Sequence, residues 1–180
     1  MTAPATPASA PAPTAPVRAL VVMGVSGSGK STIATLLADR LGWTFVEGDD
    51  LHPAANVAKM AEGVPLDDED RAPWLATIAA RVDALVSGGD SVVVTCSALR
   101  RRYRDVLRRD DLVFVHLAGT RELIADRLGA RTGHFMPPAL LDSQFEALEP
   151  LGDDERHLTV DLAGAPDEDI SQILETLHLD

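Results

Sequence analysis

Gly24-Val25-Ser26-Gly27-Ser28-Gly29-Lys30-Ser31, followed by Thr32, matches the pattern G-x-x-x-x-G-K-[ST] of a phosphate-binding P-loop. The apolar run 19–23 before it is typical of a strand, and Ile33, Leu36, Leu37 and Leu41 after it have helical spacing. Strand, glycine loop and helix thus follow in the order that the motif requires. The alternative, a plain glycine turn with an exposed lysine, does not explain these flanks.

The residue types of this loop indicate a nucleotide site. Glycines let backbone N–H groups point inward around phosphate oxygens, and the positive end of the next helix points to the same place. Lys30 is expected to reach the β- and γ-phosphates, and the Ser31 hydroxyl to ligate Mg²⁺. The expected nucleotide-binding residues are Gly24, Val25, Ser26, Gly27, Ser28, Gly29, Lys30, Ser31 and Thr32.

Composition sets the class of protein. The 180 residues suit one domain, and 46% hydrophobic content with few aromatics predicts the aliphatic core of a parallel α/β sheet. The net charge of −12 argues against nucleic acid or an anionic membrane as the partner. No apolar stretch is long enough to span a membrane. A single cysteine excludes an intramolecular disulfide, and we expect a cytoplasmic protein.

Residues 1–16 differ from the rest of the chain. They are almost wholly Ala, Pro, Thr and Ser, without a charged side chain, and five prolines oppose a helical signal segment. We expect a disordered Ala/Pro-rich tail over 1–16 and one folded domain over 17–180.

The order of elements predicts the fold. Further strands are expected at 43–46, 91–96, 112–117 and 157–162, and further helices at 53–62, 74–87, 119–130, 140–148 and 167–179. Residues 63–71 are expected to form an acidic loop, with Pro73 opening the next helix. This alternation predicts an α/β fold with a parallel sheet of about five strands and helices on both faces.

Two aspartates, Asp49 and Asp50, follow the strand 43–46 at the end where ligands gather in such sheets. A carboxylate there could orient a water on Mg²⁺ or take a proton from a substrate hydroxyl. The alternative is a cap on the next helix. Strand 91–96 ends without the acid that many P-loop proteins carry at this place, so Asp49 is the expected metal ligand.

Basic residues cluster in two places. Six arginines, Arg100, Arg101, Arg102, Arg104, Arg108 and Arg109, predict a solvated basic helix face. Arg127 and Arg131 are four apart on a predicted helix that leads into a glycine-containing loop. The pair suits a lid over phosphates, and a surface arginine pair is the alternative.

Several blocks together resemble one family. They are Gly24 to Thr32, Gly48-Asp49-x-Leu51-His52-Pro53, Asp70-Arg71-x-Pro73-Trp74-Leu75, Cys96-Ser97-Ala98-Leu99, Gly133-His134-Phe135-Met136-Pro137 and Ser143-Gln144-Phe145. Over about residues 19–162 the chain resembles gluconokinase of the P-loop, shikimate-kinase-like type. It departs from that pattern at Ala54-Ala55, where relatives often carry larger polar side chains.

The resemblance implies a three-layer P-loop kinase fold with a mobile lid, about residues 121–138. It also implies ATP-dependent phosphorylation of D-gluconate at the 6-hydroxyl with Mg²⁺, by a homodimer. The expected catalytic residues are Lys30, Asp49, Arg127 and Arg131, with the two arginines also on the nucleotide and Ser31 and Asp49 on the metal. The expected substrate contacts are Asp49, His52, Lys59, Arg71, Cys96, His134 and Gln144.

The residue chemistry agrees with this substrate. The planar donors of Arg71 suit a carboxylate, and Asp49, His52 and Lys59 offer the mixed donors and acceptors that hydroxyls need. A related kinase acting on shikimate, a nucleoside monophosphate or another sugar acid is the first alternative. A GTP-binding switch lacks its guanine motif, and a non-catalytic nucleotide-binding module would lack these acceptor-site residues.

Overall fold

The computed structural model describes residues 15–130 and 138–180. Most of the tail predicted for residues 1–16 therefore lies outside the described residues, as do Arg131 and His134. No described helix combines the length and the apolar character that crossing a membrane requires.

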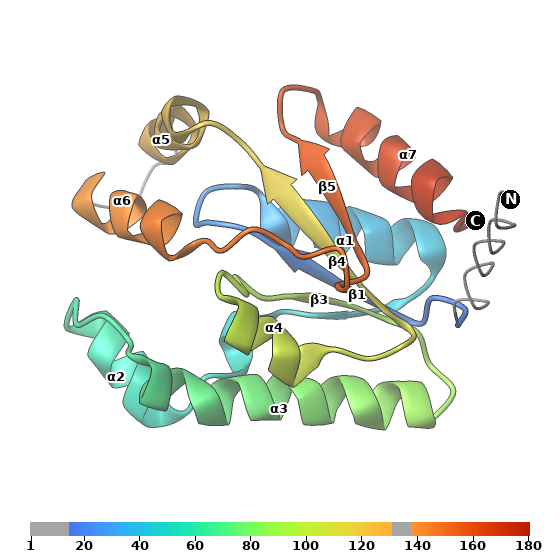
Figure 1. Ribbon diagram of the computed structural model, residues 1–180, viewed down its shortest axis with the longest axis horizontal. Coiled ribbons are helices and arrows are strands. Elements are labelled where there is room, and N and C mark those ends of the chain that lie inside the picture. The colour runs from blue at the N-terminus through green and yellow to red at the C-terminus, as the bar shows by residue number, and fades with distance from the viewer. Residues whose placement is uncertain (1–14, 131–137) are drawn as a thin grey trace, which may run out of the picture.

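A five-stranded parallel sheet forms the centre of the molecule (Figure 1). Its strands are β1 (Ala19–Met23), β2 (Thr44–Val46), β3 (Val92–Thr95), β4 (Leu112–Ala118) and β5 (His157–Asp161), in the order β2-β3-β1-β4-β5. All of β1 and β3 is buried, as expected for strands covered on both faces. Val21 pairs with both Val94 and Phe114, so β1 lies between β3 and β4.

Helices cover both faces of the sheet. On one face α1 (Lys30–Leu41) and α7 (Pro166–Leu177) share a hydrophobic cluster with the even-numbered residues of β1, and on the other lie α3 (Asp68–Ser87) and α4 (Arg101–Leu107) (Figure 1). The remaining elements are η1 (Gly48–Leu51), α2 (Ala54–Ala61), α5 (Arg121–Ala130) and α6 (Pro138–Ala147). The predicted three-layer α/β fold is confirmed.

The start of α3 differs from the prediction that Pro73 opens this helix. The helix begins at Asp68, because the Asp67 carboxylate accepts the Asp70 N–H at 2.8 Å and the Asp70 carboxylate accepts the Asp67 N–H at 3.1 Å. This reciprocal capping box satisfies two N–H groups that a helix start otherwise leaves unpaired. Pro73 is therefore accommodated inside the helix, and Arg71 lies in its first turns rather than in a loop.

Arg104 is an exception to the predicted solvated arginine face. It is fully buried, and its Nε donates to Glu155 Oε1 at 2.6 Å. Its Nη1 donates to the carbonyls of Ala98 and Leu99, each at 3.1 Å. Burial alone raises the pKa of Glu155, but hydrogen bonds from Arg104 and the Gly152 N–H outweigh it and lower the pKa. The pair joins the segment after β3 to the segment before β5.

Replacing Arg104 with methionine is expected to lower the free energy of unfolding by about 3–5 kcal/mol, because Glu155 would stay buried without its partner. Urea denaturation followed by circular dichroism measures this. The exposed Arg102 serves as the control, since Arg102→Met removes a surface pair with Asp68 and a contact with the Tyr103 ring and should change stability by about 1 kcal/mol or less. Equal effects of the two substitutions would contradict the assigned role of the buried pair.

Candidate functional site

The glycine loop joins β1 to α1 as the motif predicts, with residues 24–29 preceding the helix and Lys30, Ser31 and Thr32 in its first turn. Lys30 Nζ donates to the carbonyls of Gly24 and Val25, at 3.1 and 3.0 Å. The ammonium group thus folds back over the loop, next to the place where backbone N–H groups converge at a helix N-terminus. This is the geometry of an anion cradle.

Glu47 is a site residue that the sequence reasoning missed. The Ser31 hydroxyl donates to Glu47 Oε2 at 2.6 Å, and the Thr95 hydroxyl donates to Glu47 Oε1. One carboxylate from the end of β2 therefore meets the predicted metal-binding serine and the end of β3. Its position directly after the predicted strand 43–46 is the sequence signal that marks it as a site residue.

Gly48 allows this close approach of strand ends. A Cβ at Gly48 would lie 1.9 Å from the Thr95 carbonyl oxygen, so any side chain would force β2 and β3 apart. The Gly48 N–H donates to Thr95 Oγ1 at 3.0 Å, and Trp74 Nε1 donates to the Gly48 carbonyl at 2.8 Å. The short helix η1 that follows leaves the Asp49 side chain 80% exposed.

His52 is held in a defined tautomer. Asn56 Nδ2 donates to the Asp70 carbonyl at 2.8 Å and lies 3.2 Å from His52 Nδ1, so Nδ1 accepts and the proton is on Nε2. Trp74 stacks on the ring with centroids 4.1 Å apart. Burial lowers the pKa of His52, and Arg71 lowers it further against the opposing effect of Asp49. At neutral pH the Nε2–H is thus a neutral donor, 3.9 Å from the Asp49 carboxylate.

Lys59 and Arg71 have different hydrogen-bond partners near the start of α3. Lys59 Nζ donates to both carboxylate oxygens of Asp70, at 2.7 and 2.8 Å, so its ammonium is engaged at the start of α3. This hydrogen bond raises the pKa of Lys59. Arg71 Nε donates to the Leu66 carbonyl at 3.3 Å, and its guanidinium lies 5.7 Å from the centre of the Tyr103 ring.

Cys96 is a buried residue that directly follows β3. It is 1% exposed, and burial raises the pKa of its thiol to about 12. The positive charges of Lys30 and Arg71 act on the pKa of the thiol in the opposite direction, and the negative charge of Asp49 acts in the same direction as burial. The structure thus brings together predicted residues from the P-loop, η1 and α3. The neutral thiol is unsuited to a nucleophilic role.

The helices that flank residues 131–137 contribute two predicted residues. Arg127 on α5 donates from Nη2 to the Leu162 carbonyl at 2.9 Å, at the end of β5. Gln144 on α6 is hydrogen-bonded to Ser26 of the P-loop. The positions of Arg131 and His134 lie outside the described residues.

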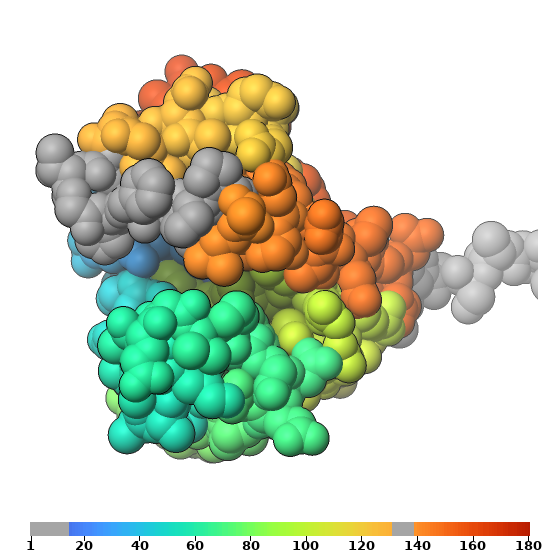
Figure 2. Space-filling model, turned by 90° about the vertical axis from the view of Figure 1, so that its left-hand side faces the viewer, coloured from blue at the N-terminus to red at the C-terminus, as the bar shows by residue number. Residues whose placement is uncertain are grey.

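Figure 2 shows the surface indented between the segment from α2 to the start of α3 and helix α6. The carboxyl ends of the strands, where the P-loop follows β1, face this side of the molecule, as Figure 1 shows. The phosphate loop, the Glu47–Ser31 pair and the polar side chains of η1 and the start of α3 therefore share one end of the sheet. This arrangement can bind a nucleotide next to a polar acceptor.

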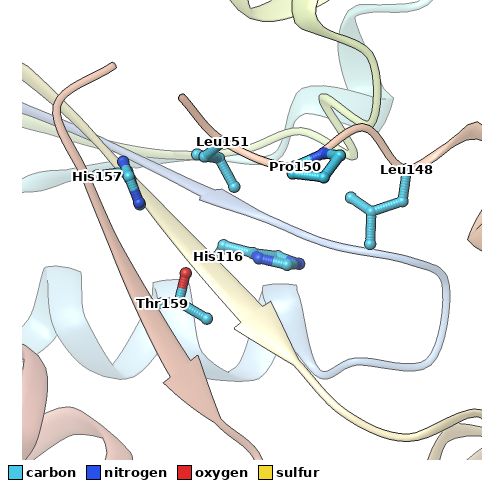
Figure 3. Close-up of a pocket in the computed structure, with 6 residues that line it drawn as sticks. All are labelled: His116, Leu148, Pro150, Leu151, His157 and Thr159. Carbon is cyan, nitrogen blue, oxygen red and sulfur yellow. The ribbon is translucent and has the colours of Figure 1, made fainter. Parts of the chain in front are cut away.

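A separate cavity of about 390 Å³ lies along the β4–β5 edge (Figure 3). It is lined by His116, Leu148, Pro150, Leu151, His157 and Thr159. Burial lowers the pKa of His116, with smaller contributions from Arg104 and His157. No P-loop residue is among the described residues that line it, so it is distinct from the candidate site.

Comparisons with known proteins identify the family. The shikimate kinase family matches residues 26–178. A gluconokinase from Gluconobacter oxydans (strain 621H) is 54% identical over 159 residues, covering 87% of this chain and 89% of the relative. The thermosensitive gluconokinase of Escherichia coli (strain K12) is 44% identical over 158 residues, covering 86% and 82%.

Solved structures give the same result. An unliganded sugar kinase from Janibacter sp. HTCC2649 has a TM-score of 0.85 at 48% identity, covering 91% of this chain and 96% of that chain. A gluconokinase from Sinorhizobium meliloti 1021 has a TM-score of 0.77 at 45% identity, covering 89% and 95%. Shikimate kinase from Aquifex aeolicus, at 16% identity and a TM-score of 0.54, shares the fold.

The sheet order, the P-loop and the adjoining polar end of the sheet define a P-loop kinase, an enzyme that transfers a phosphoryl group to an alcohol. Within that class the chain belongs to the shikimate kinase family, and among its members to the gluconokinases.

The lone cysteine allows a direct check of the site's interior. With a thiol pKa of about 12, Cys96 in the native protein should react with a disulfide reagent at pH 8 about three orders of magnitude more slowly than in guanidinium chloride, where its pKa is about 8.5. Absorbance at the released thiolate's wavelength gives both rates. A native rate near the unfolded one would show that Cys96 is accessible and ionised, contrary to the structure.

Proposed function

We propose that this protein catalyses ATP-dependent phosphorylation of D-gluconate at the 6-hydroxyl, giving 6-phospho-D-gluconate and ADP. The observation that supports the proposal is that His52 Nε2 lies 3.9 Å from the Asp49 carboxylate. Asp49 lies two residues after Glu47, whose carboxylate accepts a hydrogen bond from the hydroxyl of the P-loop residue Ser31. His52 and Asp49 come from one of the sequence blocks that distinguish a gluconokinase from other P-loop proteins. The named gluconokinases at 44–54% identity support the same substrate.

Recognition of the acceptor follows from its chemistry. D-gluconate has one carboxylate and a row of hydroxyls. Arg71, fixed through its Nε to Leu66, would use its terminal nitrogens to bind the carboxylate as a planar fork. His52 would donate its Nε2–H to a hydroxyl, and Asp49 would accept from the hydroxyl that is phosphorylated. Lys59 would act through Asp70, by fixing the start of the helix that carries Arg71.

The site residues also fit Mg²⁺, because the ion prefers oxygen ligands and commonly uses one or two carboxylates together with substrate phosphates. Among the described residues no group of three histidine, cysteine or acidic side chains forms a metal cage. The Ser31 hydroxyl and the Glu47 carboxylate, whose oxygens lie 2.6 Å apart, would hold the ion. Asp49, two residues after Glu47, would orient a water bound to the ion. Bound Mg²⁺ neutralises charge on the transferring phosphates.

Phosphoryl transfer has a loose transition state, so the protein contributes mainly position and positive charge. Lys30 supplies charge at the loop, and we propose that Arg127 and Arg131 add to it from the segment after β4. Cys96 and His134 would line the acceptor site. Asp49 would hold the acceptor hydroxyl in line and receive its proton as the new phosphorus–oxygen bond forms and the bond from the γ-phosphorus to the leaving ADP oxygen breaks.

We further propose that the enzyme acts as a cytoplasmic homodimer, as the family resemblance implies. The net charge of −12 supports a small-molecule substrate rather than a nucleic acid or an anionic membrane.

A substrate panel tests the proposed function. ADP release from MgATP should be fast with D-gluconate and near the water background with shikimate, nucleoside monophosphates and other aldonic acids. A coupled dehydrogenase assay for 6-phospho-D-gluconate identifies the product. Fast turnover with another acceptor would support phosphotransferase activity but reject gluconate as the acceptor. ATP binding without acceptor-dependent turnover would reject the enzyme.

Asp49→Asn should lower kcat with D-gluconate by about 10²-fold or more, because it removes the proton acceptor while leaving the side-chain shape. The Kd for MgADP should rise by much less than kcat falls, since Asp49 is outside the phosphate loop and would meet the metal only through a water. Steady-state kinetics and calorimetry measure the two quantities. Asp50→Asn, one residue along in the same η1 turn, is the matched control and should retain most activity. Unchanged turnover for Asp49→Asn would remove it from the mechanism.

A further inference from the structure

The apex of the phosphate loop, Ser26–Gly27, is contacted by side chains from two distant helices. The Ser26 N–H donates to Gln144 Oε1 at 2.7 Å, and Gln144 Nε2 donates to Ser26 Oγ at 3.0 Å. One carboxamide on α6 thus satisfies both the backbone and the side chain of a residue 118 positions earlier. The two bonds fix the orientation of the amide, because only its oxygen can accept the Ser26 N–H.

Leu128 on α5 covers the neighbouring residue. Gly27 has φ +82°, and a Cβ placed on it would lie 2.6 Å from Leu128 Cγ and 2.8 Å from Cδ2. The leucine side chain therefore occupies the space that the missing side chain of Gly27 leaves. An aliphatic group above a left-handed glycine limits the conformations open to the loop, while the Gln144 amide fixes the residue before it.

Gln144 is itself held in place by the protein. The Leu148 N–H continues the helix by donating to the Gln144 carbonyl at 3.0 Å, and the Glu149 N–H donates to the Leu99 carbonyl at 2.8 Å. Leu99 in turn accepts a hydrogen bond from the buried Arg104. The carboxamide is thus presented to Ser26 from a helix end that is anchored to the segment after β3.

We propose that Gln144 is a positioning residue for the phosphate loop, acting on bound nucleotide through Ser26 rather than on the acceptor, with Leu128 as its packing counterpart on Gly27. The amides of the P-loop bind phosphate only when the loop backbone points them inward. Two bonds at the apex keep the backbone in that conformation before the nucleotide arrives. The kinetic part of this inference rests on the proposed function, whereas its nucleotide-binding part does not.

The test compares Gln144→Ala with Gln144→Met, which keeps the length of the side chain and removes both hydrogen bonds. Each is expected to raise the Kd for MgADP, measured by calorimetry without acceptor, by about tenfold, from the loss of two hydrogen bonds offset by partial solvation of Ser26. The KM for D-gluconate should stay within about twofold. Ser143→Ala, an exposed neighbour on α6, is the control and should change neither value.

A double-mutant cycle with Ser26→Ala separates positioning from general destabilisation. Ser26→Ala removes only the Oγ contact, so its effect on the MgADP Kd should be smaller, and the effects of the two substitutions should not add. A raised gluconate KM with an unchanged MgADP Kd would make Gln144 an acceptor contact and overturn the proposal. Unchanged values for both, with only a lower melting temperature, would also overturn it. Because calorimetry needs no acceptor, a wrong assignment of gluconate leaves this result interpretable.

Discussion

Parallel pairing of β1 with β3 and β4 is the constraint on which the site depends. The Cys96 N–H donates to the Val22 carbonyl and the Gly24 N–H donates to the Ser97 carbonyl, so the pairing continues into the segments beyond the strands. The glycine loop and the Cys96 segment are thereby held next to each other. Parallel strands all end at the same edge of the sheet, so groups that are distant in the sequence lie close together there.

Although the chain is strongly acidic, cationic side chains at the site are held in place by hydrogen bonds to the backbone. Lys30 lies on the carbonyls of its own loop, and Arg71 is tied to Leu66 and lies against Tyr103. His52 remains neutral because burial and Arg71 both lower its pKa. A site with two fixed cations and a neutral imidazole donor suits a multiply charged phosphate beside a polyhydroxy acid, since the imidazole adds hydrogen bonding without adding charge.

Local patterns were sufficient to predict the elements that surround the loop. The apolar run before Gly24 and the helical spacing after Lys30 gave β1 and α1 almost residue for residue. The start of α3 was predicted wrongly because proline is typical of the first turn of a helix, whereas the Asp67–Asp70 capping box begins this helix at Asp68. The burial of Arg104 was also missed, because an arginine in a basic run carries no local mark of a partner such as Glu155.

By itself, the sequence determined the nucleotide-binding loop, the alternation of strands and helices, and the acceptor-site blocks, because each depends on residues close together in the chain. Only the tertiary structure decided which groups touch across the sheet edge. It showed the hydrogen bonds between Glu47 and Ser31, between Lys59 and Asp70 and between Gln144 and Ser26. These contacts depend on strand register, on a glycine that admits a neighbouring backbone and on the placement of α6, and none of these is encoded in local spacing.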